Sequence, residues 1–272
     1  MTFSTNQNIA DMAHANNSEK NSSFCNYLDA RINNTEENFN EDTINNINCN
    51  LYEIEELNTI IHNKSNQTYS AMHINIHSLP AKISQLEIML TRLNKLNIHL
   101  DFILLCETYL NEHNQNVYNI AGYRLISHNR KANRGGGVAI FIKNSIIFKH
   151  RPDLEYHIEN EFESIFIEAQ IENNNIIVGE IYRIPNTSET ESIKRFDIIS
   201  SKLSNEKKDT IIGTDQNFDY IKIENQKNTL ELLNNFLTAG LLPTITLCTR
   251  VTHTSATLID NIYINYKSSL YK

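Results

Sequence analysis

Tryptophan is absent from this chain, and proline, glycine and cysteine are scarce, at 4, 7 and 4 of 272 residues. The cysteines are Cys25, Cys49, Cys106 and Cys248; they are widely separated and form no CxxC pair. This spacing excludes a zinc finger and favours reduced thiols in an intracellular protein. No run of 18 apolar residues occurs, and no apolar segment follows a basic start, which argues against a membrane span and against secretion.

Residues 1–68 are poor in the apolar side chains that build a core. Asparagine makes up 17 of the first 70 residues, and residues 1–68 hold ten acidic against three basic side chains, a net charge of −7. Such a segment buries too little apolar surface to offset the entropy of ordering. We therefore expect a disordered, acidic leader that packs against nothing, with one short helix around residues 51–61.

The remaining chain, residues 69–272, has almost balanced charge. It holds 22 acidic and 21 basic side chains, so the overall net charge of −8 comes mainly from the leader. This balance neither prevents binding to a phosphate backbone nor supplies a basic patch for it. The length fits one large α/β domain over residues 69–272.

Strand and helix patterns alternate from residue 69 onward. Residues 71–77 alternate as a half-buried strand does, residues 80–97 carry apolar side chains at helical spacing, and residues 101–106 form the continuous apolar run of a buried strand. Residues 163–182 predict a hairpin. Further strands are expected at 122–127, 137–143, 210–213, 250–253 and 257–264, and helices at 192–203 and 229–237. This mixture predicts two mixed sheets packed face to face, with helices on the outer faces.

Polar side chains that could handle metal or phosphate lie at the ends of several predicted strands. A single carboxylate there is more often a helix cap or a solvated turn residue, and a single tyrosine is more often a core aromatic. A set of them at consecutive strand ends favours one shared site, because strand ends converge on one rim of such a sandwich. The set comprises Asn75, Glu107, Tyr182, Asp215, Asn217 and Asp260.

The order of short motifs around these residues resembles the endonuclease domain of non-LTR retrotransposons. The motifs are N-x-x-S-L at 75–79, L-L-x-E-T-x-L at 104–110, G-Y at 122–123, RGGGVAIFIK at 134–143, I-Y-R-x-P-N at 181–186, G-x-D-x-N-x-D at 213–219 and T-R-x-T-x-x-SATLIDNI at 249–262. That domain belongs to the endonuclease/exonuclease/phosphatase superfamily, which includes apurinic/apyrimidinic endonucleases. The resemblance covers about residues 69–265 and implies a four-layer, DNase I-like sandwich.

The resemblance also implies an activity, the hydrolysis of DNA phosphodiesters with one Mg²⁺ ion, which favours oxygen ligands. It makes Glu107 the principal metal ligand with Asn75 beside it, and it lets Tyr182 contact the scissile phosphate. Members of the family are normally fused to a reverse transcriptase, which this sequence lacks, and they act on DNA in the nucleus.

Four further positions match functional positions of the family. Asp215 and Asn217 would position or activate the attacking water and stabilise charge on the phosphoryl oxygens. Thr252 would line the cleft that faces DNA. Asp260 would orient a catalytic histidine, as carboxylates fix imidazole tautomers in other hydrolases.

The sequence departs from the family pattern near its C-terminal end. It has no Ser-Asp-His element beyond Asp260, and the usual G-D-F-N segment is replaced by residues 213–217, GTDQN. We therefore expect a missing final strand, an open sheet edge along residues 257–264 and weak DNA cleavage.

Several alternative interpretations remain open at this point. The glycines at 135–137 could cradle a phosphate, although a tight turn before a strand is favoured. His73 and His77 are four residues apart, but on a strand, where a shared zinc site is not favoured. For function, the alternatives are a non-catalytic remnant that binds metal or nucleic acid, and a phosphatase of the same fold.

Overall fold

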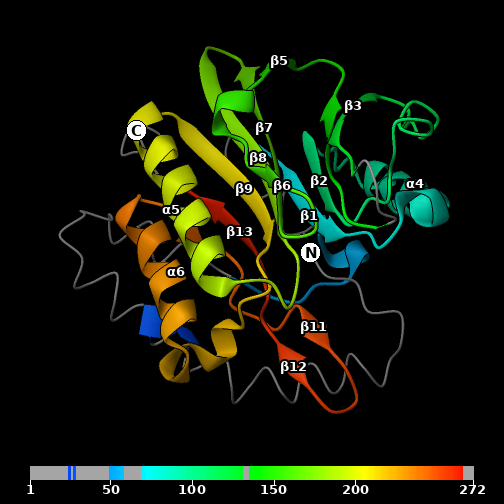
Figure 1. The fold of residues 1–272 in the computed structure, drawn as a ribbon. Helices are drawn as coiled ribbons and strands as arrows, with labels where there is room; N and C mark the ends of the chain where they lie inside the picture. The colour runs from blue at the N-terminus through cyan, green and yellow to red at the C-terminus, as the bar shows by residue number, and fades with distance from the viewer. Residues whose placement is uncertain (1–23, 26, 29–48, 58–68, 131–134, 266–272) are drawn as a thin grey trace.

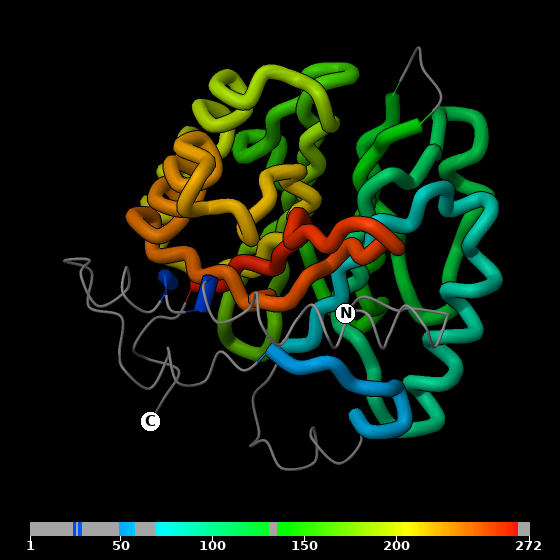
Figure 2. Tube along the Cα trace, turned by 90° about the horizontal axis from the view of Figure 1, so that it is seen from below, coloured from blue at the N-terminus to red at the C-terminus, as the bar shows by residue number. Residues whose placement is uncertain are grey.

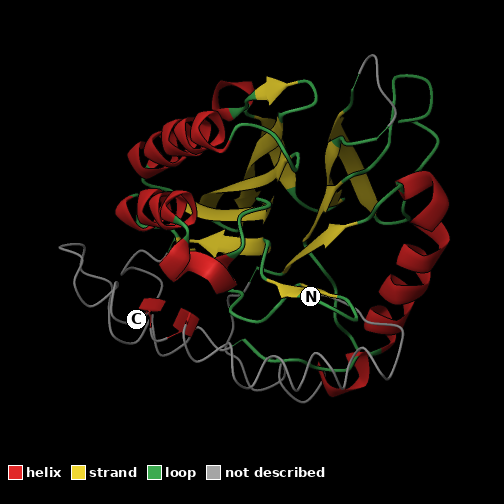
Figure 3. Ribbon diagram, turned by 60° about the horizontal axis from the view of Figure 1, so that its bottom comes forward, coloured by secondary structure: helices red, strands yellow, loops and turns green. Residues whose placement is uncertain are grey.

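The computed structural model describes residues 24–25, 27–28, 49–57, 69–130 and 135–265. Within them, two β-sheets pack face to face and helices cover both outer faces (Figures 1 and 3). The order of layers is α4, a four-stranded sheet, a seven-stranded sheet, and then α5 with α6. This four-layer α/β sandwich confirms the predicted fold class.

The four-stranded sheet has the order β1-β2-β4-β3, in which β1 and β2 are parallel and the other pairs are antiparallel. A helix, α4, connects β1 to β2, so these strands end at the same edge of the sheet. The strands are β1 (Ala71–Asn75), β2 (Phe102–Cys106), β3 (Tyr123–His128) and β4 (Val138–Lys143).

Helix α4 (Leu79–Lys95) forms because its sequence supplies both a start signal and an apolar stripe. The Ser78 hydroxyl caps it by accepting from the Ala81 amide, and proline occupies the first turn, where no amide hydrogen is needed. Leu86 and Leu90 are among the side chains that it buries against the four-stranded sheet. Each such leucine contributes about 1.5–3 kcal/mol.

The seven-stranded sheet has the order β10-β13-β9-β8-β7-β5, with β6 paired to β7. Its centre is the predicted hairpin of β7 and β8, and β9 lies parallel to β8. The strands are β5 (Ile147–His150), β6 (His157–Ile158), β7 (Phe162–Ile171), β8 (Asn174–Arg183), β9 (Asp209–Asp215), β10 (Leu242–Pro243) and β13 (Asp260–Ile264).

Helices α5 (Glu189–Glu206) and α6 (Lys227–Thr238) cover the outer face of this sheet, and the short helices η2 (Pro152–Leu154) and η3 (Tyr220–Asn225) lie nearby. Strands β11 (Arg250–Val251) and β12 (Ala256–Thr257) form a separate small hairpin. Among the described residues, no helix combines the length and apolar character needed to cross a membrane.

The two-residue period of the strands decides which side chains lie between the sheets. On β7, Phe162 and Phe166 pack toward α5 and α6, whereas Ile165 and Ile167 pack into the layer between the sheets. The same alternation turns the polar side chains of β1, β8 and β9 toward that inner layer. The candidate site therefore lies at one end of the space between the sheets.

The N-terminal leader packs against the domain at the positions that the structure describes. Phe24 and Leu28 are buried in the core beneath α6, and the Phe24 ring stacks on Tyr220 with centroids 5.1 Å apart. Ile54 and Leu57 are buried in the core beside α4. Figure 2 shows the described segment of residues 49–57, in light blue, running beside the teal helix α4. The expectation that the leader packs against nothing is wrong for these residues, because composition averaged over a long segment hides short apolar pairs at helical spacing.

The remaining expectations for the leader are only partly covered by the structure. A short 3₁₀ helix, η1 (Ile54–Glu56), lies within the helix expected around residues 51–61, and residues 58–61 lie outside the described ranges. Most of the residues expected to be disordered also lie outside those ranges, so disorder of the leader stays a prediction.

The expected open edge along residues 257–264 is wrong. Residue 257 belongs to β12 and β13 begins at Asp260, and β13 lies between β9 and β10 rather than at the edge. The Asn261 side chain holds the segment that follows β10 against β13. Its Oδ1 accepts hydrogen bonds from the amides of Thr244 and Ile245, and its Nδ2 donates to the Ile245 carbonyl. These non-local bonds supply the partners that the strand pattern alone could not reveal.

Candidate active site

The candidate site is assembled from the ends of four strands. β1 ends at Asn75, β2 is followed directly by Glu107, Tyr182 is the penultimate residue of β8, and β9 ends at Asp215. Tyr182 and Asp215 are direct neighbours in the parallel pairing of β8 with β9. The four side chains come from both sheets and meet at one rim, as the sequence predicts.

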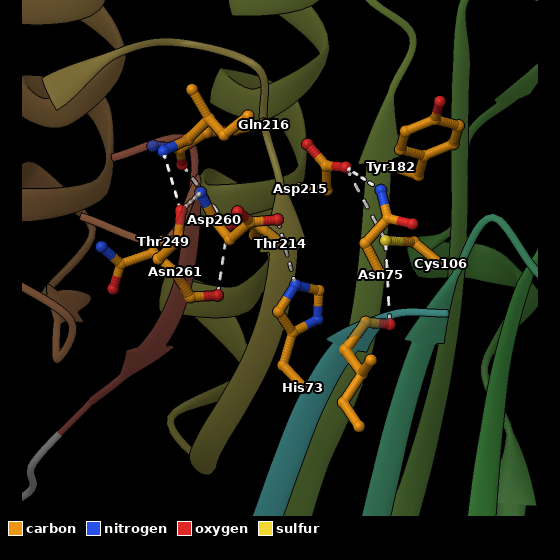
Figure 4. A network of polar contacts seen from close by, with 12 residues as sticks. His73, Asn75, Cys106, Tyr182, Thr214, Asp215, Gln216, Thr249, Asp260 and Asn261 are labelled. Atoms are coloured by element: carbon orange, nitrogen blue, oxygen red, sulfur yellow. Dashed lines mark hydrogen bonds and ion pairs between the residues drawn. The ribbon is translucent and has the colours of Figure 1, made fainter. Parts of the chain in front are cut away.

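Asn75 connects the two sheets at this rim. Its Nδ2 donates one hydrogen bond to Glu107 Oε1 and one to Asp215 Oδ2, and each is 2.8 Å long. Figure 4 shows the Asn75 amide turned toward the Asp215 carboxylate. The prediction that Asn75 and Glu107 face each other across adjacent strands is therefore confirmed in its geometry.

The Glu107 carboxylate accepts hydrogen bonds at both oxygens. Oε1 accepts from Asn75 at 2.8 Å and from the Tyr182 hydroxyl at 3.1 Å. Oε2 lies 2.9 Å from Nδ1 of His77 and accepts from the Tyr109 hydroxyl at 3.2 Å. Partial burial raises the pKa of Glu107, but the bonds from His77, Asn75 and Tyr182 outweigh it and lower that pKa. Glu107 is thus held as a carboxylate.

Tyr182 is buried, and its hydroxyl acts as a donor. Burial and the neighbouring Glu107 and Asp215 carboxylates raise the pKa of Tyr182. The phenol therefore keeps its proton and can donate it in a hydrogen bond to a phosphate oxygen or to Glu107.

Asp215 is almost fully buried, and it lacks partners that its charge requires. Burial and the nearby Asp260 raise the pKa of Asp215 well above its usual range. Its Oδ2 accepts from Asn75 and lies 3.9 Å from the Cys106 thiol. None of the four cysteines, all of which lie in the described ranges, forms a disulfide. Among the described residues, its buried Oδ1 has no hydrogen-bond partner. A buried acid in this state suits a site that a cation or a water molecule completes.

Asp260 lies beside Asp215 and faces a buried histidine. The two acids are direct neighbours in the pairing of β13 with β9. Oδ1 of Asp260 lies 3.7 Å from Nε2 of His73 (Figure 4). On the other side of the ring, Nδ1 of His73 is 3.0 Å from Oε2 of Glu180. Burial opposes the charge of His73, but the Glu180 and Asp260 carboxylates outweigh it and raise the pKa of His73 to about 10.

His73 and Glu180 are the residues that the sequence interpretation missed. Glu180 is fully buried and His73 is 4% exposed. The sequence does contain a signal for Glu180. This charged residue interrupts the apolar strand around residues 176–182 at a position whose side chain must point between the sheets. His73 and His77 do not share a site: His73 lies between the sheets, whereas the His77 side chain is 73% exposed.

A second group of possible metal ligands lies deeper between the sheets. One ligand atom each of His73, Cys106 and Glu180 falls within 4.8 Å of the others. Their burial offers no entry path, and His73 and Glu180 already pair with each other. The exposed rim with Asn75 and Glu107 is therefore the better place for an exchangeable ion.

Asn217 and Thr252 lie outside the central network. The Asn217 amide donates to the Arg183 carbonyl at 2.7 Å, and Arg183 Nη1 donates back to the Asn217 carbonyl at 3.1 Å. Among the described residues, no hydrogen bond joins Asn217 to Asp215. Thr252 is exposed in the loop between β11 and β12, where its hydroxyl accepts from the Ser255 amide.

The backbone is strained around the site. His77, Ser78, Glu107, Tyr109 and Asn217 are five of the ten described non-glycine residues with positive φ. Each such conformation costs about 1–3 kcal/mol and persists only where the surrounding structure enforces it, often at functional sites. The concentration of this strain at adjoining strand ends supports the location of the site.

The glycines before β4 form a turn that contacts Thr108 and Tyr109, the two residues after Glu107. Gly137 has φ +86, and a Cβ there would lie 2.5 Å from the Thr108 hydroxyl. The Gly137 carbonyl accepts from the Thr108 amide, and the Gly137 amide donates to the buried Glu163 at 2.6 Å. This favours the tight turn over a phosphate cradle for residues 135–137; residues 131–134 lie outside the described ranges.

No family model matches the sequence, and no curated protein matches it. Solved structures do match. The endonuclease domain of TRAS1, a telomere-specific non-LTR retrotransposon, aligns at TM-score 0.56 and 13% identity, over 73% of this chain and 85% of that chain. The chain has the endonuclease/exonuclease/phosphatase fold.

Two further structures with this fold are also similar. TDP2 of D. rerio, complexed with a single strand DNA product, aligns at TM-score 0.50 and 12% identity, over 74% of this chain and 85% of that chain. TDP2 of Caenorhabditis elegans aligns at TM-score 0.51 and 12% identity, over 73% of this chain and 64% of that chain. At such identities the likeness concerns the endonuclease/exonuclease/phosphatase fold, and activity has to be argued from the site.

Proposed function

We propose that this chain is a Mg²⁺-dependent phosphodiesterase that nicks DNA. The observation that carries the proposal is the meeting of Asn75, Glu107, Tyr182 and Asp215 at one rim, joined by hydrogen bonds of 2.8–3.1 Å. Carboxylate and amide groups are the ligands that Mg²⁺ prefers, and a hydroxyl donor beside them suits a phosphate oxygen.

The residues at the rim fit a divalent cation. The Asn75 amide nitrogen lies between the carboxylates of Glu107 and Asp215, where it partly offsets their repulsion. A cation would offset that repulsion more fully. The proposal is supported by Asp215 Oδ1, a buried oxygen that has no hydrogen-bond partner among the described residues. Glu107 and Asn75 would hold the ion. When bound, it would supply charge stabilisation at the phosphoryl oxygens and lower the pKa of water.

The remaining residues would position the substrate and move a proton. The Tyr182 hydroxyl would donate to a phosphate oxygen. Asp215, whose pKa is raised, would accept a proton from the attacking water or orient it, and Asn217 would contact the phosphate beside it. Thr252 would touch DNA from its exposed loop.

We expect the nicking rate of this chain to be low. By resemblance, Asp260 orients a catalytic imidazole, but the imidazole next to it here is that of His73, which is too buried to reach a substrate. Lack of one acid–base group lowers a rate about 10²–10⁴-fold.

The biological setting that we propose is a retrotransposon polyprotein. The support is the order of motifs from Asn75 to Ile262 and the fold shared with the TRAS1 endonuclease domain. In that setting the partner is DNA, a reverse transcriptase follows the domain, and the protein acts in the nucleus.

A plasmid-nicking assay tests the proposal. Supercoiled DNA is incubated with the chain and Mg²⁺, and the relaxed form is quantified against Glu107→Gln and against Glu112→Gln, an exposed glutamate in the following loop. We expect slow nicking that requires Mg²⁺, is lost in Glu107→Gln and persists in Glu112→Gln.

Two outcomes favour the alternative functions. Mg²⁺ binding without nicking, under conditions in which a related endonuclease is active, would indicate a non-catalytic remnant. Release of phosphate from a monoester, without DNA nicking, would indicate a phosphatase of the same fold.

A further inference from the structure

His77 is an exposed imidazole that the backbone turns back toward the candidate metal site. It follows β1 by two residues and has φ 45°, a backbone conformation that is uncommon for residues other than glycine. Its Nδ1 lies 2.9 Å from Glu107 Oε2 and 3.0 Å from the Tyr109 hydroxyl. The His77 and Tyr109 rings also pack edge to face, with centroids 5.3 Å apart. A side chain that is 73% exposed is thus held at one point beside the carboxylate.

An ion that binds Glu107 must displace one of its hydrogen-bond donors. A carboxylate has about four acceptor positions, and here Asn75, Tyr182, His77 and Tyr109 all approach it. Only two of these four groups can turn an atom with a lone pair toward the ion in place of the hydrogen that they donate to Glu107. The asparagine amide can present its oxygen, and the imidazole can present the lone pair of Nδ1 when its proton is on Nε2. The two phenols keep a proton that can still donate.

The position of Tyr109 suits the ligand form of His77. Its hydroxyl lies within hydrogen-bond distance of both Nδ1 and Glu107 Oε2, so it can donate to whichever atom is not otherwise engaged. The 2.9 Å between Nδ1 and Oε2 is also close to the spacing of neighbouring ligands in an octahedral site, about 3 Å for bonds of about 2.1 Å.

We propose that His77 is a nitrogen ligand of the metal site and that the site prefers a first-row transition ion, Mn²⁺, to Mg²⁺. The proposal rests on the proposed metal-dependent function and goes beyond it in naming a third ligand and a different ion. One imidazole beside carboxylate and amide oxygens favours transition ions, because Mg²⁺ binds nitrogen weakly, whereas Mn²⁺ accepts both kinds of ligand.

Direct spectroscopy of Mn²⁺ bound to the full chain tests the proposal without relying on activity. Affinity is measured by the loss of the free-ion EPR signal, and electron spin-echo modulation then detects a nitrogen coupled to the bound ion. The variants are His77→Gln, Glu107→Gln and His113→Gln, the last being an exposed histidine outside the site. Mg²⁺ binding is measured by competition against Mn²⁺.

In the wild-type chain and in His113→Gln, we expect nitrogen modulation and tighter binding of Mn²⁺ than of Mg²⁺. His77→Gln should abolish the modulation and weaken Mn²⁺ binding about tenfold or more, in line with the effect of altering metal-site partners. It should leave Mg²⁺ binding within about threefold, because water can replace the imidazole on Mg²⁺.

The outcomes separate this inference from the proposed function. Mn²⁺ that binds through Glu107 but shows no nitrogen modulation, or modulation that survives His77→Gln, would overturn the role of His77 and leave the metal site intact. Binding of Mn²⁺ and Mg²⁺ that is unchanged in Glu107→Gln would overturn the metal site itself, and His77 with it.

Discussion

His73 and Glu180 join the two sheets directly below the candidate active site, with His73 Nδ1 3.0 Å from Glu180 Oε2. One side chain comes from β1 and the other from β8, and both are buried. Charges in such surroundings are costly unless they are paired, so each residue requires the other. The pair also lies next to Asp260, and His73 therefore helps to hold the Asp260 carboxylate in position.

Removing one partner of this pair should destabilise the fold strongly. We expect Glu180→Ala to lower the free energy of unfolding by about 3–5 kcal/mol, because His73 is left without its main counter-charge. Urea denaturation measures the loss. The double variant His73→Leu with Glu180→Leu should be less destabilised than Glu180→Ala, since no buried charge remains. A double variant that is less stable than Glu180→Ala would contradict this account of the pair.

A side chain at Gly213 should collide with the same pair. A Cβ there would lie 2.3 Å from Glu180 Oε2 and 2.8 Å from His73 Nδ1. We expect Gly213→Ala to cost about 1–3 kcal/mol, the usual cost of overpacking. In the Glu180→Ala background the cost should be smaller by about 1 kcal/mol, because the nearest atom is gone. Equal costs in both backgrounds, in a double-mutant cycle of unfolding free energies, would rule out this collision.

The Tyr182 hydroxyl should matter for catalysis as well as for folding. Tyr182→Phe keeps the buried ring but removes the 3.1 Å hydrogen bond to Glu107, and bonds to charged groups contribute about 1.5–3 kcal/mol. We expect kcat for plasmid nicking to fall about tenfold or more. Tyr123→Phe is the matched control, because its hydroxyl donates to the Leu100 carbonyl away from the site. A similar fall in both variants would indicate a general effect of losing a phenol.

Glu206, which lies away from the candidate active site, should make the free energy of unfolding depend on pH. Its hydrogen bonds to Arg151 and Lys208 lower the pKa of Glu206 to about 2, from 4.5. A lowered pKa stabilises the fold above about pH 4.5, and this contribution is lost as pH falls toward 2. The unfolding free energies of wild type and Glu206→Gln should therefore differ by about 1 kcal/mol at pH 7 and converge near pH 2. Glu224→Gln, at an exposed position, is the control for the substitution itself. A Glu206→Gln difference that widens in acid would refute the assignment.

The sequence by itself determined the elements and much of the rim. The two-residue period in β1 and the apolar run of β2, joined by an amphipathic helix, require two parallel strands that end together. Local pattern alone therefore makes Asn75 and Glu107 neighbours. The β7–β8 hairpin is predictable for the same reason, because alternation and a polar turn are local properties of the chain.

Only the tertiary structure decided how the two sheets meet. The bond from Asn75 to Asp215 and the pair of His73 with Glu180 cross between sheets and span more than 100 residues, so no local pattern encodes them. The turn of His77 toward Glu107 depends on backbone strain that the surrounding packing enforces. The coverage of β13 by β10 and by the residues that follow it depends on non-local contacts. The burial of Phe24 and Ile54 does so as well. Periodicity fixes which face of an element is buried, whereas the partner of that face is set by how all the layers pack together.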